Sequence, residues 1–151
     1  MTIGSFCVFF NIQSFIFYLR RDPYLLRGTP IQTMSKIQVS ANIKIPEGML
    51  EEFKQYAAEC IKQVKKKDSE TLQYDWFLSS DKTECEIREI YKSSEAVLKH
   101  QSNIREPLGA LFEKFGLPNS LVIYGDPSPQ LLEHAKASGI DIKIFTYLQG
   151  L

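Results

Sequence analysis

Few residues in this 151-residue sequence combine a type and a position that suit chemistry. His100 stands near the end of an expected helix, and Glu89 shares the face of an expected strand with Ile87 and Tyr91. Histidine titrates near neutral pH and suits a general base, while burial would raise the pKa of a carboxylate. The two residues predict a site of proton transfer, with His100 as base and Glu89 as its partner. The alternatives are a His100 favoured by the helix dipole and a Glu89 paired with a basic residue.

Two large aromatic residues alternate on the preceding strand. Tyr74 and Trp76 share one strand face and could stack on a planar substrate, or they could belong to the core or to a dimer interface. His134 falls in a short late helix and is expected at the surface. No GxGxxG, GKS, GKT or HExxH motif occurs. The odd number of cysteines, at long spacings, indicates neither a disulfide framework nor a metal site, and favours a reducing, cytoplasmic location.

The elements that would position these residues follow from periodicity. Residues 37–45 alternate between apolar and polar types, which predicts a half-buried strand. Residues 49–67 carry an apolar stripe at steps of three and four, which predicts a helix. Further strands are expected at 72–78, 83–91, 121–124 and 142–148, and further helices at 93–103, 105–115 and 129–138. The order β-α-β-β-α-(α)-β predicts an α+β fold of the ferredoxin-like, split βαβ type.

Residues 1–33 are expected to stand apart from a domain at 34–151. Their apolar run lacks the basic start and the cleavage site of a signal peptide, and it is short for a membrane span. A translation start at Met34 is the favoured reading, because a strand follows directly. A membrane anchor remains the alternative, and it is the only route by which a membrane would be a partner. The net charge of zero excludes no fold but gives no reason to expect nucleic-acid binding.

Several segments resemble the antibiotic biosynthesis monooxygenase family. They are the expected hairpin at 74–81, the strand and helix at 88–100, the Val-Ile-Tyr-Gly-Asp-Pro-Ser-Pro run at 122–129 and the last residues at 149–151. The resemblance covers most of residues 36–151. It implies a homodimer in which two sheets form an α+β barrel, with a pocket between sheet and helices in each protomer. An exposed sheet face carrying Leu72, Ile87 or Phe145 would favour the same dimer.

The resemblance also suggests an activity. Some family members oxygenate hydroquinones or polyphenols with molecular oxygen and without flavin, metal or haem, so no cofactor and no metal are expected here. Asn42 matches a position where some relatives place an asparagine in the pocket. Tyr91 stands where haem-degrading relatives carry a tryptophan, which argues against haem but leaves a pocket role. The leading hypothesis is a cofactor-independent monooxygenase of a small aromatic substrate; the alternative is a non-catalytic dimer for small-molecule binding or stress response.

Overall fold

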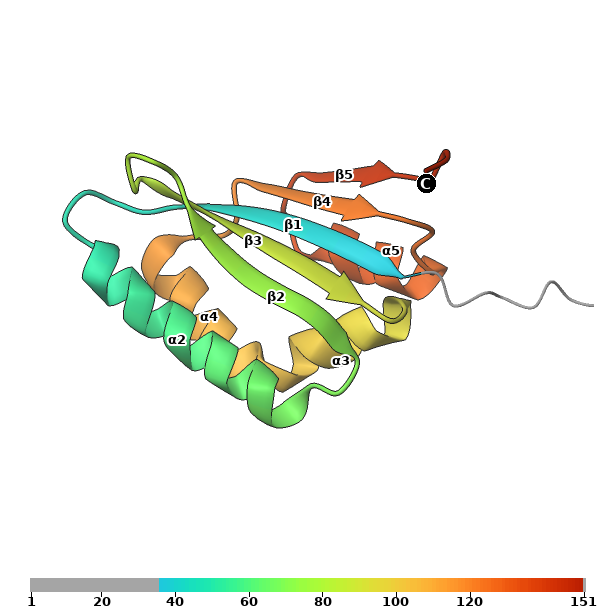
Figure 1. Cartoon of the computed structure of the whole chain (residues 1–151), viewed down its shortest axis with the longest axis horizontal. Helices are drawn as coiled ribbons and strands as arrows, with labels where there is room; N and C mark the ends of the chain where they lie inside the picture. Colours follow the sequence, from blue (N-terminus) through green and yellow to red (C-terminus); the bar gives the residue numbers. More distant parts are fainter. Residues whose placement is uncertain (1–35, 151) are drawn as a thin grey trace, which may run out of the picture. The chain divides into compact units, whose positions relative to one another are not determined.

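The computed structural model describes residues 36–150, which form a mixed five-stranded sheet with helices on one side (Figure 1). The expected leader at 1–33 lies outside the described residues. The strands are β1 (Ile37–Lys44), β2 (Thr71–Leu78), β3 (Glu84–Tyr91), β4 (Ser120–Tyr124) and β5 (Ile142–Phe145). The helices are α2 (Leu50–Lys67), α3 (Ser94–Asn103), α4 (Arg105–Phe115) and α5 (Pro129–Ala137). Within residues 36–150, no helix has the length and apolar character needed to cross a membrane.

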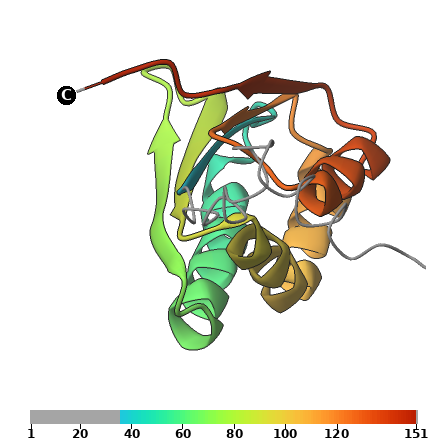
Figure 2. The ribbon, with the colours of Figure 1, turned by 90° about the vertical axis from the view of Figure 1, so that its right-hand side faces the viewer.

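The strands follow the order β2-β3-β1-β4-β5. β1 runs antiparallel to β3 and β4, β2 runs antiparallel to β3, and β5 runs parallel to β4. The elements from β1 to β4 have the split βαβ arrangement, and α5 with β5 extends the sheet at one edge. The prediction of an α+β, ferredoxin-like fold is therefore confirmed. Figure 2 shows the helices together on one side of the curved sheet.

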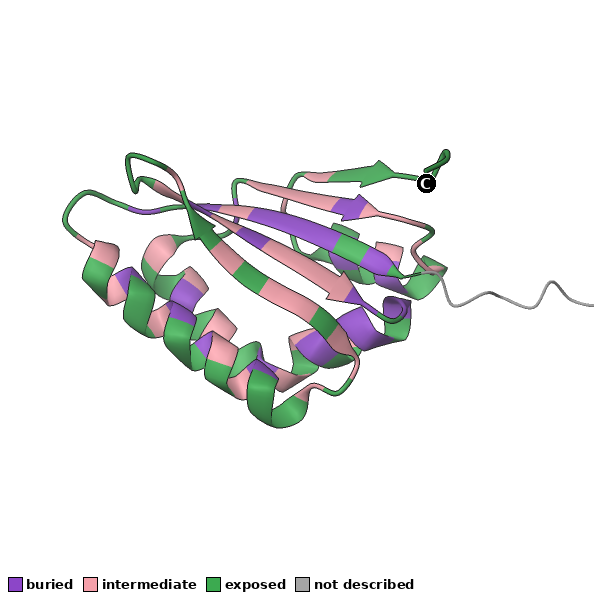
Figure 3. Ribbon diagram, in the orientation of Figure 1, coloured by how far each residue is buried: buried purple, intermediate pink, exposed green. Residues whose placement is uncertain are grey.

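The central strand β1 owes its burial to its alternating sequence (Figure 3). Ile37 and Ile43 have no exposed surface, and Val39 and Ala41 are also buried, on the side that the helices cover. Residues with odd numbers in β1 face the helices, because successive side chains point to opposite faces of a strand. The opposite face carries Gln38, Ser40, Asn42 and Lys44.

Helix α2 packs on the sheet through the predicted stripe. Its buried residues are Phe53, Ala57, Cys60 and Val64. Acidic residues stand in the first turn and lysines in the last, and both placements suit the helix dipole. Complete burial of a side chain such as Phe53, which is 1% exposed, contributes about 2–3 kcal/mol through the hydrophobic effect.

Three details of the sheet differ from the sequence prediction. β5 ends at Phe145 rather than at Leu148, because its partner β4 ends at Tyr124 and offers no further hydrogen bonds. The alternation of residues 72–78 predicts that Leu72 and Tyr74 share a strand face, but an irregularity between Thr71 and Gln73 shifts the register, and Leu72 is exposed while Tyr74 is half-buried. Ile87 lies buried in the core under the helices and is not available to a partner subunit. The dimeric barrel stays a prediction.

Candidate functional site

A cavity of about 340 Å³ lies between the helix-facing side of the sheet and helices α3, α4 and α5. The part of its wall that β1 contributes is apolar and consists of Val39, Ala41 and Ile43. Its lining includes members of both apolar clusters of the core. A space of this size, mainly apolar with a few polar groups, is typical of a small-molecule site.

The exposed members of the lining mark where the cavity opens. They are Ser102, Arg105, Gly109, His134 and Ser138. These residues come from the end of α3, from α4 and from α5, so the opening lies between the α3–α4 junction and α5. His134 is exposed, as predicted, and it also lines the cavity.

The polar groups at the inner part of the cavity are Glu89, His100 and Tyr74. They come from three elements: Glu89 from β3, His100 from α3 and Tyr74 from β2. Glu89 and Tyr74 are paired neighbours in the β2–β3 ladder, on the face that the helices cover. The Tyr74 ring lies 5.0 Å from the His100 ring in an edge-on arrangement. Thus the structure places three of the six residues that the sequence singled out at the cavity.

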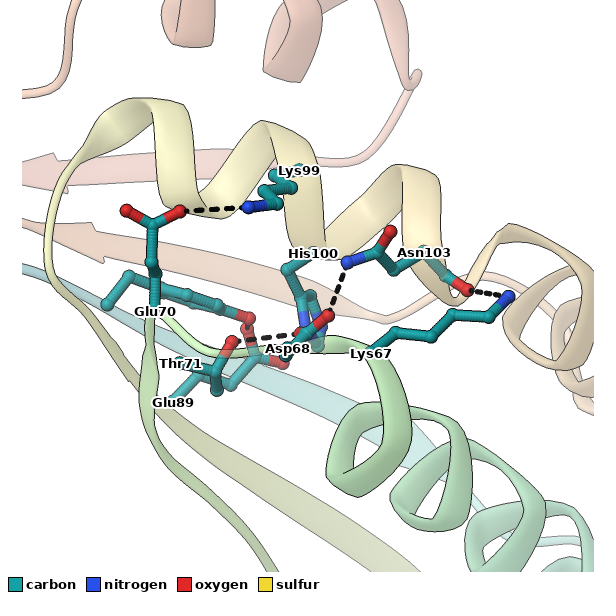
Figure 4. Close-up of polar contacts among 9 residues, drawn as sticks. Lys67, Asp68, Glu70, Thr71, Glu89, Lys99, His100 and Asn103 are labelled. Atoms are coloured by element: carbon teal, nitrogen blue, oxygen red, sulfur yellow. Dashed lines mark hydrogen bonds and ion pairs between the residues drawn. The ribbon is translucent and has the colours of Figure 1, made fainter.

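His100 is held in one orientation by Asp68, which caps the end of α2 (Figure 4). The His100 Nδ1 atom lies 2.5 Å from Asp68 Oδ2, and each side chain is 3% exposed. Asn103 Nδ2 and Thr71 Oγ1 also donate hydrogen bonds to the Asp68 carboxylate, at 2.6 Å and 2.9 Å. The Tyr91 ring packs 5.1 Å from the imidazole. The partner of His100 is therefore Asp68, and not Glu89 as the sequence suggested.

These contacts set the protonation states of the pair. Burial opposes ionisation of Asp68, but hydrogen bonds from Asn103, His100 and Thr71 together lower the pKa of this carboxyl. Burial lowers the pKa of His100 and outweighs the opposing effect of Asp68. A neutral imidazole beside a carboxylate carries its proton on Nδ1. The Nε2 atom is then a proton acceptor, and within residues 36–150 it makes no hydrogen bond.

Glu89 is the second titratable group at the cavity. It accepts a hydrogen bond from the Tyr91 hydroxyl, at 2.6 Å. Burial raises the pKa of Glu89 to about 7, against the opposing effect of this hydrogen bond. Burial and the charge of Glu89 hold the pKa of Tyr91 and of Tyr74 well above the ordinary value, so both phenols keep their protons. Glu89 can therefore give or take a proton near neutral pH.

Three of the predicted site residues do not line the cavity. Tyr91 is completely buried and acts through its contacts with Glu89 and His100. Trp76 faces the helices but packs against Phe53, with ring centroids 6.0 Å apart. Asn42 is paired with Glu86 on the opposite face of the sheet, and its amide donates to Glu84 and Glu86.

Asp68 was not among the residues predicted for the site, because it lies 32 positions away from His100 in the chain. It ends a run of lysines at the end of a helix, where an acidic residue is unfavourable for the helix dipole. A threonine three positions later can bond to it locally, as Thr71 does. These two features are the signal that could have identified it.

Two further kinds of chemistry could involve the described residues: nucleophilic attack by a cysteine and binding of a metal ion. Burial raises the pKa of Cys60 to about 12 and that of Cys85 to about 11, so both remain thiols at neutral pH. In the described part of the chain, no three His, Cys, Asp or Glu side chains are grouped as metal ligands would be.

Comparison with known proteins places the fold. No family model matches the sequence, and no curated protein matches it. MupZ from Pseudomonas fluorescens has a similar structure, with a TM-score of 0.63 and 22% identity over 77% of this chain and 93% of its own. Rv0793 from Mycobacterium tuberculosis gives a TM-score of 0.54 and 17% identity over 62% of this chain and 97% of its own. A candidate antibiotic biosynthesis monooxygenase from Caulobacter crescentus CB15 gives a TM-score of 0.51 and 21% identity over 60% of this chain and 87% of its own. The resemblance to the antibiotic biosynthesis monooxygenases is thus confirmed at the level of the fold.

Proposed function

We propose that this chain, which has the fold of the antibiotic biosynthesis monooxygenases, oxygenates a hydroquinone or polyphenol with molecular oxygen in the cavity between sheet and helices. The observation that carries the proposal is the pairing of an apolar cavity with two groups suited to proton transfer, the Asp68–His100 pair and Glu89. Such a cavity holds an aromatic ring, and the two groups handle the protons of its hydroxyls.

The reaction needs an electron-rich substrate, since the substrate itself reduces oxygen. A hydroquinone and O₂ give a hydroxyquinone and water. Both phenolic hydroxyls become carbonyls, one oxygen atom replaces a ring hydrogen as a new hydroxyl, and the other oxygen atom leaves as water. Both phenolic hydroxyls lose a proton, and the departing oxygen atom gains protons. A site with two proton carriers matches this requirement.

The residues take distinct roles in this scheme. His100 Nε2 accepts a proton from one phenolic hydroxyl, which raises the electron density of the ring. Asp68 stabilises the imidazolium that forms, as a buried carboxylate does for a catalytic histidine in other enzymes. Glu89 exchanges the second proton. Tyr74 packs beside His100 and contacts the bound ring from the β2 side.

Oxygen uptake under oxygen-18 gas tests the proposal directly. The full-length chain is mixed with a panel of hydroquinones, and a sample without protein measures autoxidation. Uptake above that control, with one labelled oxygen atom in the product, is expected. Stabilisation of the protein by the same compounds without uptake would instead favour the non-catalytic binding protein.

The homodimer and the cytoplasmic location belong to the same proposal. Exposed apolar side chains on the sheet, among them Phe77 and Phe145, favour a second copy as partner. Sedimentation of the full-length chain tests this assembly, and a monomer at micromolar concentration would contradict it.

A further inference from the structure

We propose that the opening of the cavity is an anion subsite, where Arg105 binds a carboxylate of the substrate while its phenolic ring reaches Glu89 and His100. The inference rests on the proposed function and narrows it, because it restricts the substrate to hydroquinones that carry an acidic group.

Among residues 36–150, Arg105 is the one lining residue that carries a fixed charge at neutral pH. It is exposed at the opening, and within residues 36–150 it forms no ion pair and no side-chain hydrogen bond. By contrast, Lys99 and Lys114 are paired with Glu70 and Glu52. A guanidinium whose donors have no partner in the described part of the chain suits a carboxylate, which it can bind through two parallel hydrogen bonds.

Gln101 adds an independent sign of a ligand beside Arg105. It lines the cavity, and its Oε1 atom is buried without a hydrogen-bond partner within the described residues. Gln63 Oε1 and Trp76 Nε1 also lack a partner within the described residues, but of these three residues Gln101 is the one that lines the cavity. Buried polar atoms are nearly always satisfied, so this amide fits a water or a polar ligand group in the cavity. The amide can turn to present either its oxygen or its nitrogen to that group.

Gln101 and Arg105 flank the junction between α3 and α4, where Ile104 departs from helical geometry with φ −105° and ψ 11°. Ile104 N donates to the His100 carbonyl and Leu108 N donates to the Ile104 carbonyl, so a hydrogen bond of helical type lies on each side of this residue. Gln101, Arg105 and Leu108 all line the cavity, so both helices contribute to this part of its wall.

The charges in the cavity fix the orientation of the substrate. Glu89 is the only carboxylate that the described residues contribute to the lining, and it lies at the inner end with His100. An acidic substrate group there would meet a like charge whenever Glu89 is ionised. The neighbouring acids Glu106 and Glu133 do not line the cavity. The carboxylate thus belongs at the opening, and the apolar walls between the two ends accept an aromatic body of roughly two or three fused rings.

Binding of a matched pair of ligands without oxygen tests the inference. The probes are 1,4-dihydroxy-2-naphthoic acid and its methyl ester, which differ in charge but share the ring and the hydroxyls. Titration calorimetry on the full-length protein measures both dissociation constants. We expect the acid to bind about tenfold more tightly than the ester, as a partly solvated charge-assisted pair gives.

Three variants assign the difference to Arg105. Arg105→Gln should weaken binding of the acid about tenfold and leave the ester nearly unchanged, while Arg105→Lys should keep most of the preference. Lys66→Gln makes the same change in net charge on an exposed part of α2 outside the cavity lining, and should alter neither constant. Equal affinities of the wild-type protein for acid and ester, equal losses in Arg105→Gln, or no binding of either compound would overturn the inference.

The binding experiment and the oxygen-uptake experiment can fail independently of each other. Because binding is measured without oxygen, a charge preference lost in Arg105→Gln would support the subsite even if no oxygen were consumed. Oxygen uptake with neutral hydroquinones, together with equal affinity for acid and ester, would support the monooxygenase and overturn the subsite.

Discussion

The Nδ1 atom of His100 lies 2.5 Å from Oδ2 of Asp68, and each side chain is 3% exposed. A histidine in water turns freely and exchanges its tautomers. Here Asp68 fixes the ring and the tautomer, and Asn103 and Thr71 fix Asp68 in turn. The other ring nitrogen, Nε2, is the proton acceptor of His100, and His100 lines the apolar cavity. The fixed ring therefore holds this acceptor in one orientation.

Asp68→Asn should reduce turnover more than it reduces binding. The change removes the charge that stabilises a protonated His100, and the effect of Asp68 is to raise the pKa of that imidazole. The pKa of His100, measured by NMR titration, should therefore fall further in the variant. We expect kcat to fall about tenfold or more, with KM changed little. A variant with an unchanged His100 titration and unchanged kcat would remove Asp68 from the site.

Acid should weaken the wild-type protein through the same carboxylate. Because hydrogen bonds lower the pKa of Asp68 in the folded state, its contribution to stability is present above the unfolded pKa and is lost as pH falls through the folded value. Asp68→Asn should cost about 1–3 kcal/mol at pH 7, and less as the pH drops below about 4. Urea unfolding of the wild-type protein and the variant, at pH 7 and below about pH 4, measures the loss of unfolding free energy at each pH. An equal loss at the two pH values would contradict the prediction.

Glu89→Gln should stabilise the protein at high pH. Burial raises the pKa of Glu89 from 4.5 to about 7, so the folded state binds more protons than the unfolded state between these values. Stability of the wild-type protein therefore falls as pH rises through this window and levels off above it. The variant does not lose stability in this window. Its unfolding free energy relative to the wild-type protein should therefore rise between pH 5 and pH 8, by at most about 3 kcal/mol. Glu133→Gln, on the exposed side of α5, serves as control and should show no such difference.

Tyr91→Phe should shift the pH dependence of the reaction upward. The Tyr91 hydroxyl donates to Glu89 and lowers the pKa of this carboxyl. Without that donor, the pKa of Glu89 rises further above 7. Since Glu89 must be ionised to accept a proton, the rise of kcat/KM with pH should move to higher pH in the variant. An unshifted profile would show that Glu89 does not limit the reaction.

Gly109→Ala should stabilise the protein, whereas a larger residue should close the cavity. Gly109 lies within α4 at the cavity opening, and a Cβ atom added there meets nothing within 4 Å. Alanine in a helix interior is favoured over glycine by about 0.8–1 kcal/mol, so the melting temperature should rise. Gly109→Leu should raise KM for the hydroquinone substrate, because Gly109 lines the cavity and a larger side chain there takes up space at the opening. Equal KM values in both variants would place the entrance elsewhere.

The sequence was sufficient for the fold because each element carried its own local signal. The alternation in β1 and the stripe in α2 appear in the structure as predicted. The helices expected at 93–103 and 129–138 begin where the Ser93 and Ser128 side chains accept hydrogen bonds from Ala96 N and Leu131 N. The end of β5 was missed because it depends on the length of its neighbour β4, which no local pattern in β5 encodes.

The site was only partly predictable, because side-chain partners depend on which sheet face is covered. His100 and Glu89 stood out by type, and both line the cavity. The family resemblance led to the expectation of Asn42 at the cavity, but the alternation of β1 places this residue on the face opposite to the helices. Asp68 was missed because its contact with His100 joins the ends of two helices that are distant in the sequence.

Oxygen uptake by His100→Ala, with the hydroquinone of the panel that the wild-type protein oxidises fastest, is the most direct test of His100 as the base of the proposed reaction. Lys99→Ala is the matched control, because Lys99 precedes His100 on α3 and its ion pair with Glu70 is exposed. We predict that His100→Ala lowers kcat by about 10²–10⁴, as loss of a general base does, while Lys99→Ala retains wild-type turnover. Full oxygen uptake by a folded His100→Ala protein would contradict the assignment of His100 as the base that starts the reaction.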